Sequence, residues 1–275
     1  MINFENVFYQ YSKNENWALQ KIHLSIFPGE WVAIVGSNGS GKSTLAKLMN
    51  GLLIPTRGEI NVFGRNPCCD NDLWEIRRMM GIVFQNPDLQ IVGNTIEDDI
   101  AFGLENIGVP PVEIDKRLTV VMGQFQLYPL KNQSPHTLSP GQKQKLAIAG
   151  ILAMKPKVII FDEASSMQSQ KDTQELYRMI SDLHKQGTTI VQITHEMEDL
   201  YGCERIIVLQ DGMVKLEGKS GDILANTIMM KEAGLIPPFA VRIRDSLMES
   251  GYDEFRDAIT PDRLVKQICK LALKM

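Results

Sequence analysis

Short apolar runs and amphipathic stretches alternate along most of the chain. Up to about Ala33 the pattern is typical of strands, with aromatic and β-branched residues interrupted by the polar segments SKNEN and PGE. Further apolar runs predict strands at 31–35 (WVAIV), 58–63 (GEINVF), 81–85 (GIVFQ), 158–161 (VIIF), 188–194 (TTIVQIT) and 205–218, where a hairpin turns at Asp211–Gly212. Helical patterns follow at 42–52 and over most of 96–153. Strands alternating with helices predict an α/β fold with a largely parallel core and an antiparallel flank.

The pattern changes after about residue 222, where the chain becomes helical and rich in methionine. Thr260 is a good N-cap for a last helix, and Pro261 suits its first turn. Leu264, Ile268 and Leu271 fall on one face of that helix, which suits either packing on its own domain or contact with another subunit. We therefore expect one domain at 1–221 and a helical extension at 222–275.

Composition narrows the class of protein only a little. The 275 residues are 44% hydrophobic and 23% charged, as in ordinary globular proteins, and the net charge of −4 gives no overall footprint for nucleic acid. Cys68, Cys69, Cys203 and Cys269 show neither zinc spacing nor a disulfide framework, which favours reduced cytosolic thiols. The N-terminus lacks the pattern of a signal peptide, and no apolar run approaches the ~20 residues of a membrane span. We therefore expect membrane association only through partners.

A phosphate-binding loop is predicted directly after the apolar run at 31–35. The segment GSNGSGKS at 36–43 fits G-x-x-x-x-G-K-[ST] and stands between a strand and a helix, the context that a P-loop requires. Lys42 is expected to reach the β- and γ-phosphates of a nucleotide, and Ser43 to offer its hydroxyl to Mg²⁺. The residues predicted to form this loop are Gly36, Ser37, Asn38, Gly39, Ser40, Gly41, Lys42, Ser43 and Thr44.

Two adjacent acids complete the predicted chemistry. In VIIFDE at 158–163, four apolar residues predict a buried strand, expected to lie beside the P-loop strand, with Asp162 and Glu163 at its end. Asp162 can hold the magnesium through water, and Glu163 can polarise the attacking water. An apolar run that ends in two acids is often only a strand reaching the surface, but the upstream P-loop favours the functional interpretation.

Together these motifs resemble the ATP-binding cassette (ABC) ATPases over about residues 1–220. LSPGQKQKLAIAG at 138–150 resembles the family's signature, Gln85 its Q-loop glutamine, His195 its switch histidine and Tyr11 the aromatic residue that stacks on adenine. The resemblance implies an ABC-type P-loop NTPase with a mixed β core, a helical signature subdomain at about 96–153 and a small C-terminal extension. It further implies that Lys42, Glu163 and His195 are catalytic, that Ser43, Gln85 and Asp162 hold Mg²⁺, and that Tyr11, the P-loop, Gln85, Ser139, Gly141 and Gln142 contact ATP.

A narrower resemblance is carried by FQNPDLQIVGNTIEDDIAFGLENIGVP at 84–110, which is similar to the ATPases of energy-coupling factor transporters, in particular the first of their two paralogues. It implies a heterodimer with a second ATPase, a transmembrane T component and a substrate-binding S component. Such complexes import vitamins or transition-metal ions, and the S component selects the substrate. The chain would then lie peripherally on the cytoplasmic face of the cell membrane. The resemblance places the contact with the membrane subunit at about Gln85–Glu105, although periodicity alone favours a plain surface helix there.

Two positions depart from the family pattern. The signature has Pro140 where glycine is usual, but Ser139 as N-cap and Gln142 three residues later form a capping box, so the helix start should be stable. We expect the affinity for phosphate to be tuned here, with the function kept. The Leu-Asp of the D-loop is replaced by Gln168 and Ser169. Because each ATP in this family lies between one chain's P-loop and the other's signature, Glu163 and His195 serve this chain's own ATP. The altered groups serve the partner's ATP, which predicts unequal hydrolysis at the two sites.

Two alternatives remain open at this point. Gln168 and Ser169 also suit a structural or regulatory subunit that binds ATP with little hydrolysis of its own. A soluble ABC ATPase of DNA repair or translation would share the motifs, but such proteins usually have a coiled-coil insertion or two cassettes in one chain, and neither pattern is present in the sequence.

Overall fold

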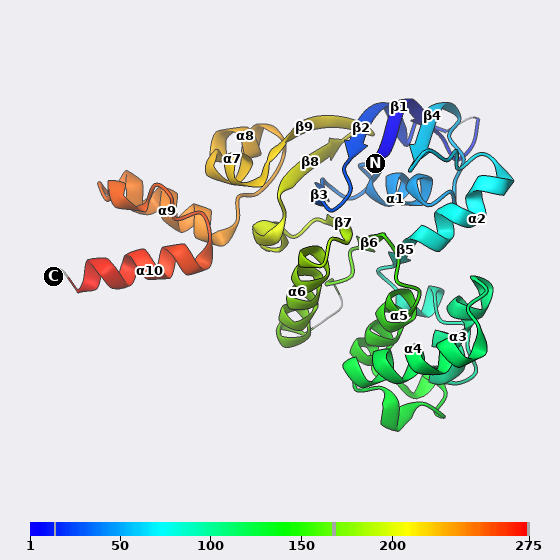
Figure 1. Ribbon diagram of the computed structural model, residues 1–275. Coiled ribbons are helices and arrows are strands. Elements are labelled where there is room, and N and C mark those ends of the chain that lie inside the picture. The colour runs from blue at the N-terminus through cyan, green and yellow to red at the C-terminus, as the bar shows by residue number, and fades with distance from the viewer. Residues whose placement is uncertain (14, 167–168, 274–275) are drawn as a thin grey trace.

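The computed structural model describes residues 1–13, 15–166 and 169–273. Its larger sheet has the strand order β5-β6-β7-β3-β8-β9, and every neighbouring pair is parallel except β8 and β9 (Figure 1). These strands are β3 (Trp31–Val35), β5 (Met80–Val83), β6 (Val158–Asp162), β7 (Thr189–Thr194), β8 (Arg205–Gln210) and β9 (Met213–Lys219). The hairpin predicted at Asp211–Gly212 joins β8 to β9, so this prediction and that of a parallel core are confirmed.

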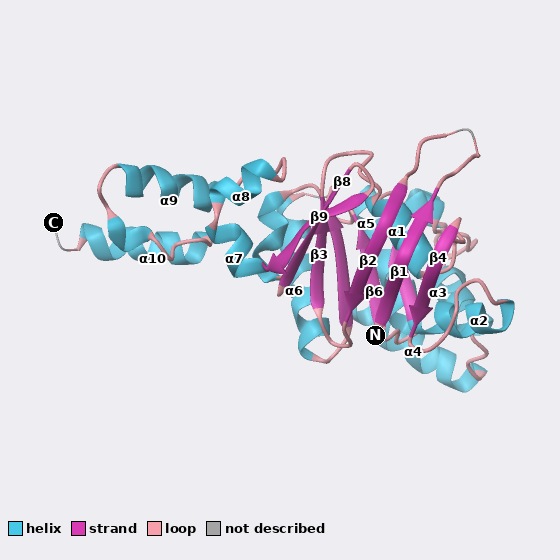
Figure 2. Ribbon diagram, turned by 90° about the horizontal axis from the view of Figure 1, so that it is seen from above, coloured by secondary structure: helices cyan, strands magenta, loops and turns pink. Residues whose placement is uncertain are grey.

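A second, antiparallel sheet forms the flank that the sequence predicts. It has the order β2-β1-β4, from β1 (Ile2–Tyr9), β2 (Leu19–Ile26) and β4 (Arg57–Val62). Helix α1 (Lys42–Met49) packs between the two sheets, where Leu45 and Leu48 meet Phe4 of β1 and Ile34 of β3 in one apolar cluster. Figure 2 shows the two sheets from above. The P-loop helix is therefore held from both sides.

The parallel strands are apolar throughout because both faces of their sheet are covered. In β3, Ile34 faces α1, whereas Val35 joins a second cluster with Ile180 of α6 (Gln170–Lys185) and Ile148 of α5 (Pro140–Ala153). Strands buried on both faces show continuous apolar runs instead of alternation. This explains the runs WVAIV and VIIF.

The predicted neighbourhood of β6 and β3 is wrong. Strand β7 lies between them, and its Ile193 is paired with Ile34 of β3 on one side and with Asp162 of β6 on the other. An apolar run shows that a strand is buried but not which strands flank it. The order is set by the connections, since α6 joins β6 to β7 and so makes these two strands neighbours.

A helical region follows β5. Helices α3 (Ile96–Asn106), α4 (Pro111–Gln124) and α5 bury Ile100, Leu118 and Leu146 in a third cluster, as the apolar periodicity over 96–153 predicts. Helix α2 (Asp70–Met79) was not predicted. It buries only Ile76, and so much polar sequence gives little helical periodicity to recognise.

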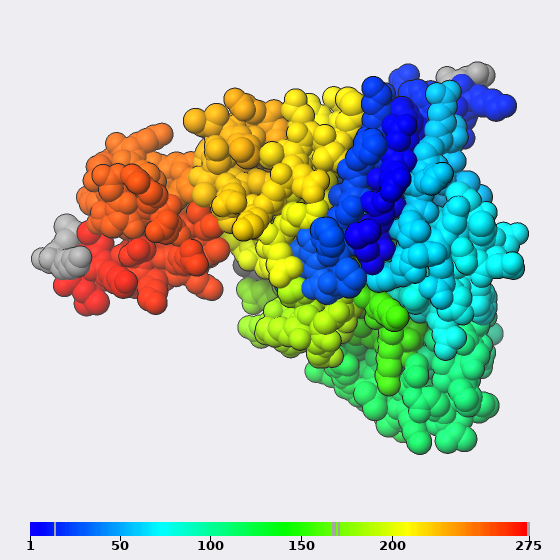
Figure 3. Space-filling model, turned by 45° about the horizontal axis from the view of Figure 1, so that its top comes forward, coloured from blue at the N-terminus to red at the C-terminus, as the bar shows by residue number. Residues whose placement is uncertain are grey.

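The C-terminal helices form two groups. Helices α7 (Ser220–Ala225) and α8 (Thr227–Glu232) pack on the main sheet through Ile223, Leu224 and Met230. Helices α9 (Phe239–Glu249) and α10 (Pro261–Ala272) share a small cluster of their own and project as a separate lobe (Figure 3). Thr260 caps α10 with Pro261 in its first turn, as predicted. Across the described ranges, no helix has both the length and the apolar character needed to span a bilayer.

Candidate active site

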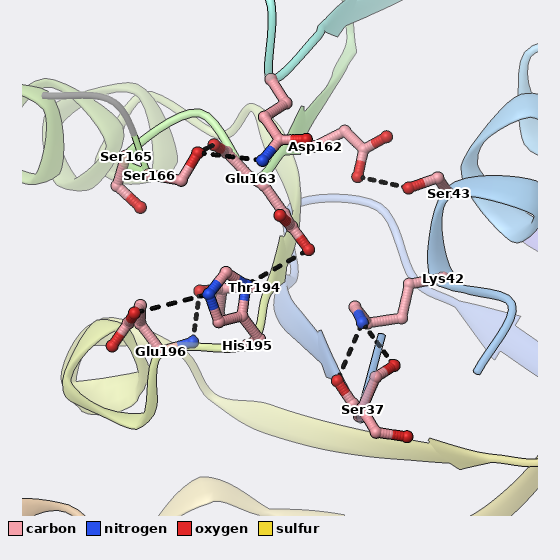
Figure 4. A network of polar contacts seen from close by, with 12 residues as sticks. Ser37, Lys42, Ser43, Asp162, Glu163, Ser165, Ser166, Thr194, His195 and Glu196 are labelled. Carbon is pink, nitrogen blue, oxygen red and sulfur yellow. Dashed lines mark hydrogen bonds and ion pairs between the residues drawn. The ribbon is translucent and has the colours of Figure 1, made fainter. Parts of the chain in front are cut away.

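The P-loop, Gln85, the two acids and His195 lie at the carboxyl ends of four neighbouring parallel strands, whereas Tyr11 follows β1 and the signature residues lie at the start of α5. The P-loop follows β3, Gln85 follows β5, Asp162 ends β6 and His195 follows β7. The carboxyl edge of an open α/β sheet is where such folds bind ligands, because the connecting loops gather there. Figure 4 shows side chains from three of these strand ends pointing toward one another.

The P-loop backbone requires glycine at two positions. Gly36 has φ 154°, and a Cβ there would lie 2.1 Å from the carbonyl oxygen of Leu209. Gly41 is the N-cap of α1 with φ 102°, and its Cβ would lie 2.7 Å from the carbonyl oxygen of Ala18. The loop is therefore threaded between β8 and the segment before β2, with the N-terminus of α1 directed at the phosphate site.

Lys42 is buried at the start of α1, and its ammonium group is held by the loop itself. The Nζ donates to the carbonyl oxygens of Gly36, at 2.8 Å, and Ser37, at 3.0 Å (Figure 4). Burial lowers the pKa of Lys42, an effect opposed by the carboxylates of Glu163 and Asp162. The Lys42 ammonium group therefore lies close to the carboxylates that are expected to act on the bound phosphates.

Ser43 and Asp162, the two predicted magnesium ligands at the ends of the P-loop and β6, are joined by a hydrogen bond. The Ser43 hydroxyl donates to Oδ1 of Asp162 at 3.0 Å (Figure 4). Asp162 is buried, and burial raises its pKa, while the Ser43 hydrogen bond acts in the opposite direction. A buried carboxylate beside a hydroxyl is stabilised by a cation, and hard oxygen donors are the ligands that Mg²⁺ prefers.

Glu163 turns away from the strand toward His195. Its backbone has φ 52°, in the left-handed region, and its N–H donates to the carbonyl of Ile193 in β7 at 2.9 Å. This conformation costs on the order of 1–3 kcal/mol in a non-glycine residue and is concentrated at functional sites. It brings Oε1 of Glu163 to 3.3 Å from Nδ1 of His195, while Nε2 of His195 lies 3.4 Å from Glu196.

Gln85 and Tyr11 lie at the edges of this group. Among the described residues, the hydrogen bond of the Gln85 amide goes to the Ser166 hydroxyl at 3.3 Å, and Ser166 in turn donates to the carbonyl of Glu163. The Tyr11 hydroxyl lies 2.9 Å from Oγ1 of Thr44, and its ring is largely exposed. Gln85 thus joins the carboxylate loop, and Tyr11 is exposed beside the P-loop, with its ring in an edge-to-face contact with that of Tyr9.

The signature residues lie at the N-terminus of α5. Ser139 and Gln142 form the predicted capping box, with Pro140 at the first helical position, so this prediction is confirmed. In the described chain, no hydrogen bond or ion pair joins Ser139, Gly141 or Gln142 to the P-loop. Helix α5 is tied instead to α6, through the ion pairs of Lys145 with Asp172 and Glu175.

The altered D-loop is described only in part. Gln168 lies outside the described residues. Ser169 caps α6 as predicted: its hydroxyl accepts from the N–H of Asp172 and donates to the Asp172 carboxylate at 2.6 Å. The Ser169 hydroxyl thus already forms hydrogen bonds within its own chain.

Sequence reasoning missed three side chains that support these loops, namely Ser166, Thr194 and Glu196. Ser166 links Gln85 to the Glu163 loop, Thr194 accepts from the N–H of Glu196 at 2.9 Å, and Glu196 contacts His195. Their only signal in a single sequence is that they stand one to three residues from a motif.

The fold and these side chains define an ATP-binding cassette ATPase. Residues 19–166 match the family model described as ABC transporter. The chain is 41% identical over 275 residues to the energy-coupling factor transporter ATP-binding protein EcfA1 of Clostridium novyi, covering 98% of each chain, and 42% identical over 275 residues to that of Geobacillus kaustophilus, covering 100% of this chain and 98% of the other. It belongs to the energy-coupling factor transporter ATP-binding proteins, a family of ATP-hydrolysing transporter subunits.

The similar solved structures are also ATP-binding cassettes or components of ABC transporters. A cbiO1 protein of Clostridium perfringens, described as part of the ABC transporter complex cbiONQ, is similar with a TM-score of 0.74 and 32% identity, covering 89% of this chain and 98% of the other. A dimeric ATP-binding cassette bound to ADP and phosphate is similar with a TM-score of 0.73 and 31% identity, covering 80% of this chain and 99% of the other. The expected fold class is confirmed.

Proposed function

We propose that this chain is one ATPase of a pair that drives an importer of vitamins or transition-metal ions. Its partners would be a paralogous ATPase, a membrane-embedded T component and a substrate-binding S component, which would hold it on the cytoplasmic face of the membrane. The names of its relatives and the cbiONQ complex of the similar cbiO1 protein support this assembly. Val265 and Ile268 of α10 are exposed apolar residues, which supports a subunit contact for the extension.

The residues at the sheet edge fit a magnesium ion bound together with nucleotide. Ser43 and Asp162 offer hydroxyl and carboxylate oxygens, and Gln85, whose amide donates to Ser166 beside the Glu163 loop, would add an amide oxygen. Within the described ranges, no group of three or more His, Cys, Asp and Glu side chains is placed to hold a metal alone. Mg²⁺ characteristically takes one or two protein ligands and completes its shell with phosphate oxygens and water. When bound, the ion neutralises charge that develops on the phosphates.

Different side chains of this protein bind the base, bind the phosphates and activate the attacking water. Tyr11 stacks on the base, and the N–H groups of the P-loop hold the phosphates at the N-terminus of α1. Lys42 exchanges its carbonyl partners for phosphate oxygens. Glu163 orients the attacking water and accepts its proton, and His195, in contact with Glu163, holds that carboxylate in place.

Two composite sites of unequal activity follow from the D-loop. Ser169 stands where the family has an aspartate that reaches the other chain's P-loop, and its hydroxyl is already bonded within the cap of α6. We therefore infer that this chain's own ATP has a full hydrolytic set, whereas the partner's ATP receives a weaker contribution from this chain.

The contact with the membrane subunit is proposed at η1 (Pro87–Leu89), the segment after it and α3. Leu89, Val92 and Phe102 are exposed apolar side chains. The N–H groups of Val92 and Gly93 donate to the carboxylate of Asp99, which anchors this segment to α3 one turn before Phe102. This surface segment directly follows Gln85 in the chain. A movement of the segment would therefore be transmitted from Gln85 through Ser166 to the Glu163 loop.

The observation that carries the proposed function is the convergence of Ser43, Asp162, Glu163 and His195 beside the P-loop. Its test is the ATPase rate of the assembled transporter with Glu163→Gln in this chain. We expect turnover at this chain's site to fall on the order of 100-fold or more, with ATP still bound. Glu59→Gln, at an exposed position of β4, is the matched control. Turnover near the wild-type rate would show that Glu163 does not serve hydrolysis.

A further inference from the structure

A buried acid lies behind the hydrolytic residues. Asp199 belongs to η4 (Met197–Gly202), the short 3₁₀ segment after His195, and is 8% exposed. One of its carboxylate oxygens, Oδ2, accepts from the Thr194 hydroxyl at 2.8 Å and from the Ser165 hydroxyl at 2.9 Å. Thr194 directly precedes His195, and Ser165 stands two residues after Glu163. A single oxygen atom therefore joins the histidine loop to the carboxylate loop.

A second layer of buried polar groups supports this junction. The Tyr177 hydroxyl of α6 donates to the Ser165 hydroxyl at 3.4 Å, and the Gln192 amide of β7 donates to the Tyr177 hydroxyl at 3.0 Å and to the carbonyl of Asp199 at 3.1 Å. Gln192 is itself fixed by the indole N–H of Trp31 at 2.9 Å. Burial raises the pKa of Tyr177, so its hydroxyl remains a proton donor. The network thus extends from β3 to both loops.

Hydroxyl groups provide the side-chain stabilisation of the Asp199 carboxylate. In the part of the chain that the structure describes, no Lys, Arg or His forms an ion pair with Asp199. A buried carboxylate that loses a donor is costly, and low polarity strengthens the bonds that remain. Moving either loop away breaks one of these two bonds, so both loops are held at a fixed separation.

We propose that Asp199 is a positioning residue for ATP hydrolysis. Through Thr194 and Ser165 it sets the backbones of the two loops so that His195 and Glu163 remain in contact at 3.3 Å. The inference rests on the roles proposed above for Glu163 and His195. It assigns to Asp199 no contact with nucleotide, because the carboxylate acts only through the loops it joins.

The test is made on the full-length chain in the assembled transporter. Asp199→Asn keeps the shape of the side chain but replaces one acceptor oxygen with a donor. Thr194→Val and Ser165→Ala each delete one of the two bonds. We expect each change to lower kcat on the order of 10- to 100-fold, as loss of alignment does, while KM for magnesium–ATP and affinity for a fluorescent non-hydrolysable ATP analogue change less than about twofold. Asp182→Asn, at an exposed position of α6, is the matched control and leaves kcat unchanged.

A double-mutant cycle separates positioning from general damage. In a His195→Ala background, Asp199→Asn should lower kcat much less than it does in the wild type, because residues that act through one another are not additive. If Asp199→Asn fails to fold, as judged by thermal unfolding, the near-isosteric Thr194→Val and the small Ser165→Ala changes decide the question.

Two results overturn the inference: kcat within about twofold of wild type in both Thr194→Val and Ser165→Ala, or fully additive effects in the cycle. Glu163→Gln, measured in parallel, distinguishes failure of the proposed hydrolytic role of Glu163 from failure of the positioning role of Asp199. If that variant keeps its turnover, the proposed hydrolytic role is wrong. If it loses turnover while the Asp199, Thr194 and Ser165 variants do not, only the positioning role is wrong.

Discussion

The carboxylate of Glu163 and the imidazole of His195 are in direct contact, with Oε1 3.3 Å from Nδ1. The two residues come from different strand ends, β6 and β7. The left-handed backbone of Glu163 turns its side chain toward the histidine. The side chain of Glu163 is 13% exposed and that of His195 is 38% exposed, so the histidine lies on the solvent side of the pair.

Replacing His195 with alanine should therefore disable hydrolysis more than binding. The phosphate contacts of the P-loop do not involve His195, but Glu163 loses the partner that fixes it. We expect turnover of the assembled complex to fall on the order of 100-fold, with the affinity for ATP little changed, measured by steady-state kinetics and equilibrium binding. His23→Ala, at an exposed position of β2, controls for loss of a histidine. If His195→Ala lowered the affinity for ATP as much as it lowered turnover, the assignment of His195 to hydrolysis would be wrong.

How far the sequence predicted this site depends on how local each feature is. The P-loop at Lys42 and the caps at Ser139, Ser169 and Thr260 involve only neighbours in sequence, and such patterns can be recognised directly. The place of β7 between β3 and β6 depends on pairing across the chain, and the prediction there was wrong.

The supporting side chains are harder to recognise than the motifs. Asp199 is one acid among several in HEMED, and only the folded chain shows that it accepts from Ser165, a residue 34 positions away. Alternation of polar and apolar residues carries no signal for such a bond. The same is true of Gln85 and Ser166, which meet only because β5 and β6 are neighbours in the sheet.

Restoring an acid at the D-loop should raise activity. Ser169→Asp places the family's carboxylate at the start of α6, where aspartate is as good an N-cap as serine. We expect a modest loss of thermal stability, because the new carboxylate faces that of Asp172, and faster ATP hydrolysis by the complex, through the partner's site, in a coupled ATPase assay. Ser169→Ala should also destabilise the chain, by about 1 kcal/mol, but without raising the rate. A Ser169→Asp complex slower than wild type would refute the idea that this position limits the partner's site.

Two helix caps allow stability and function to be separated. Ser139→Ala and Thr260→Ala each remove a side chain that accepts from the third N–H of its helix, at a cost of about 1 kcal/mol. Both variants should show a similar drop in unfolding free energy in denaturant titrations. Only Ser139→Ala should also reduce ATPase activity of the complex, because Ser139 belongs to the signature that we propose contacts the partner's ATP. Equal activity losses would mean that Ser139 contributes stability alone.

The proposed contact with the membrane subunit can be tested with a pair of surface variants. Phe102→Glu on α3 should leave the stability of the isolated chain within about 0.5 kcal/mol of wild type, because the side chain is half exposed. The charge should prevent assembly with the membrane subunit, measured by co-purification. Val120→Glu on α4 is the control, since Val120 is similarly exposed but lies outside the proposed contact. Normal assembly of the Phe102 variant would place the contact elsewhere.

The cysteines should differ sharply in reactivity. Burial raises the pKa of Cys203 to about 11, so roughly one molecule in a thousand carries that thiolate at pH 8. Cys68, Cys69 and Cys269 are exposed. Maleimide followed by mass spectrometry should therefore modify the exposed thiols within the folded chain and leave Cys203 intact until the chain unfolds. Labelling of Cys203 at the rate of Cys269 would indicate local opening of the sheet at η4.

Strand β7 lies between β6, which carries Asp162, and β3, which leads into the P-loop and α1, where Ser43 lies. Neighbouring strands are about 4.8 Å apart, so β3 and β6 are held roughly 10 Å from each other. The P-loop and the first turn of α1 bring the Ser43 hydroxyl to Asp162 across this separation. The place of Ser43 relative to Asp162 thus depends on how α1 packs on the sheet, where Val191 and Ile193 of β7 share an apolar cluster with Leu45 of α1. Inherited or engineered changes in this strand would retune metal affinity from inside the protein core, and a search confined to the walls of the site would overlook them.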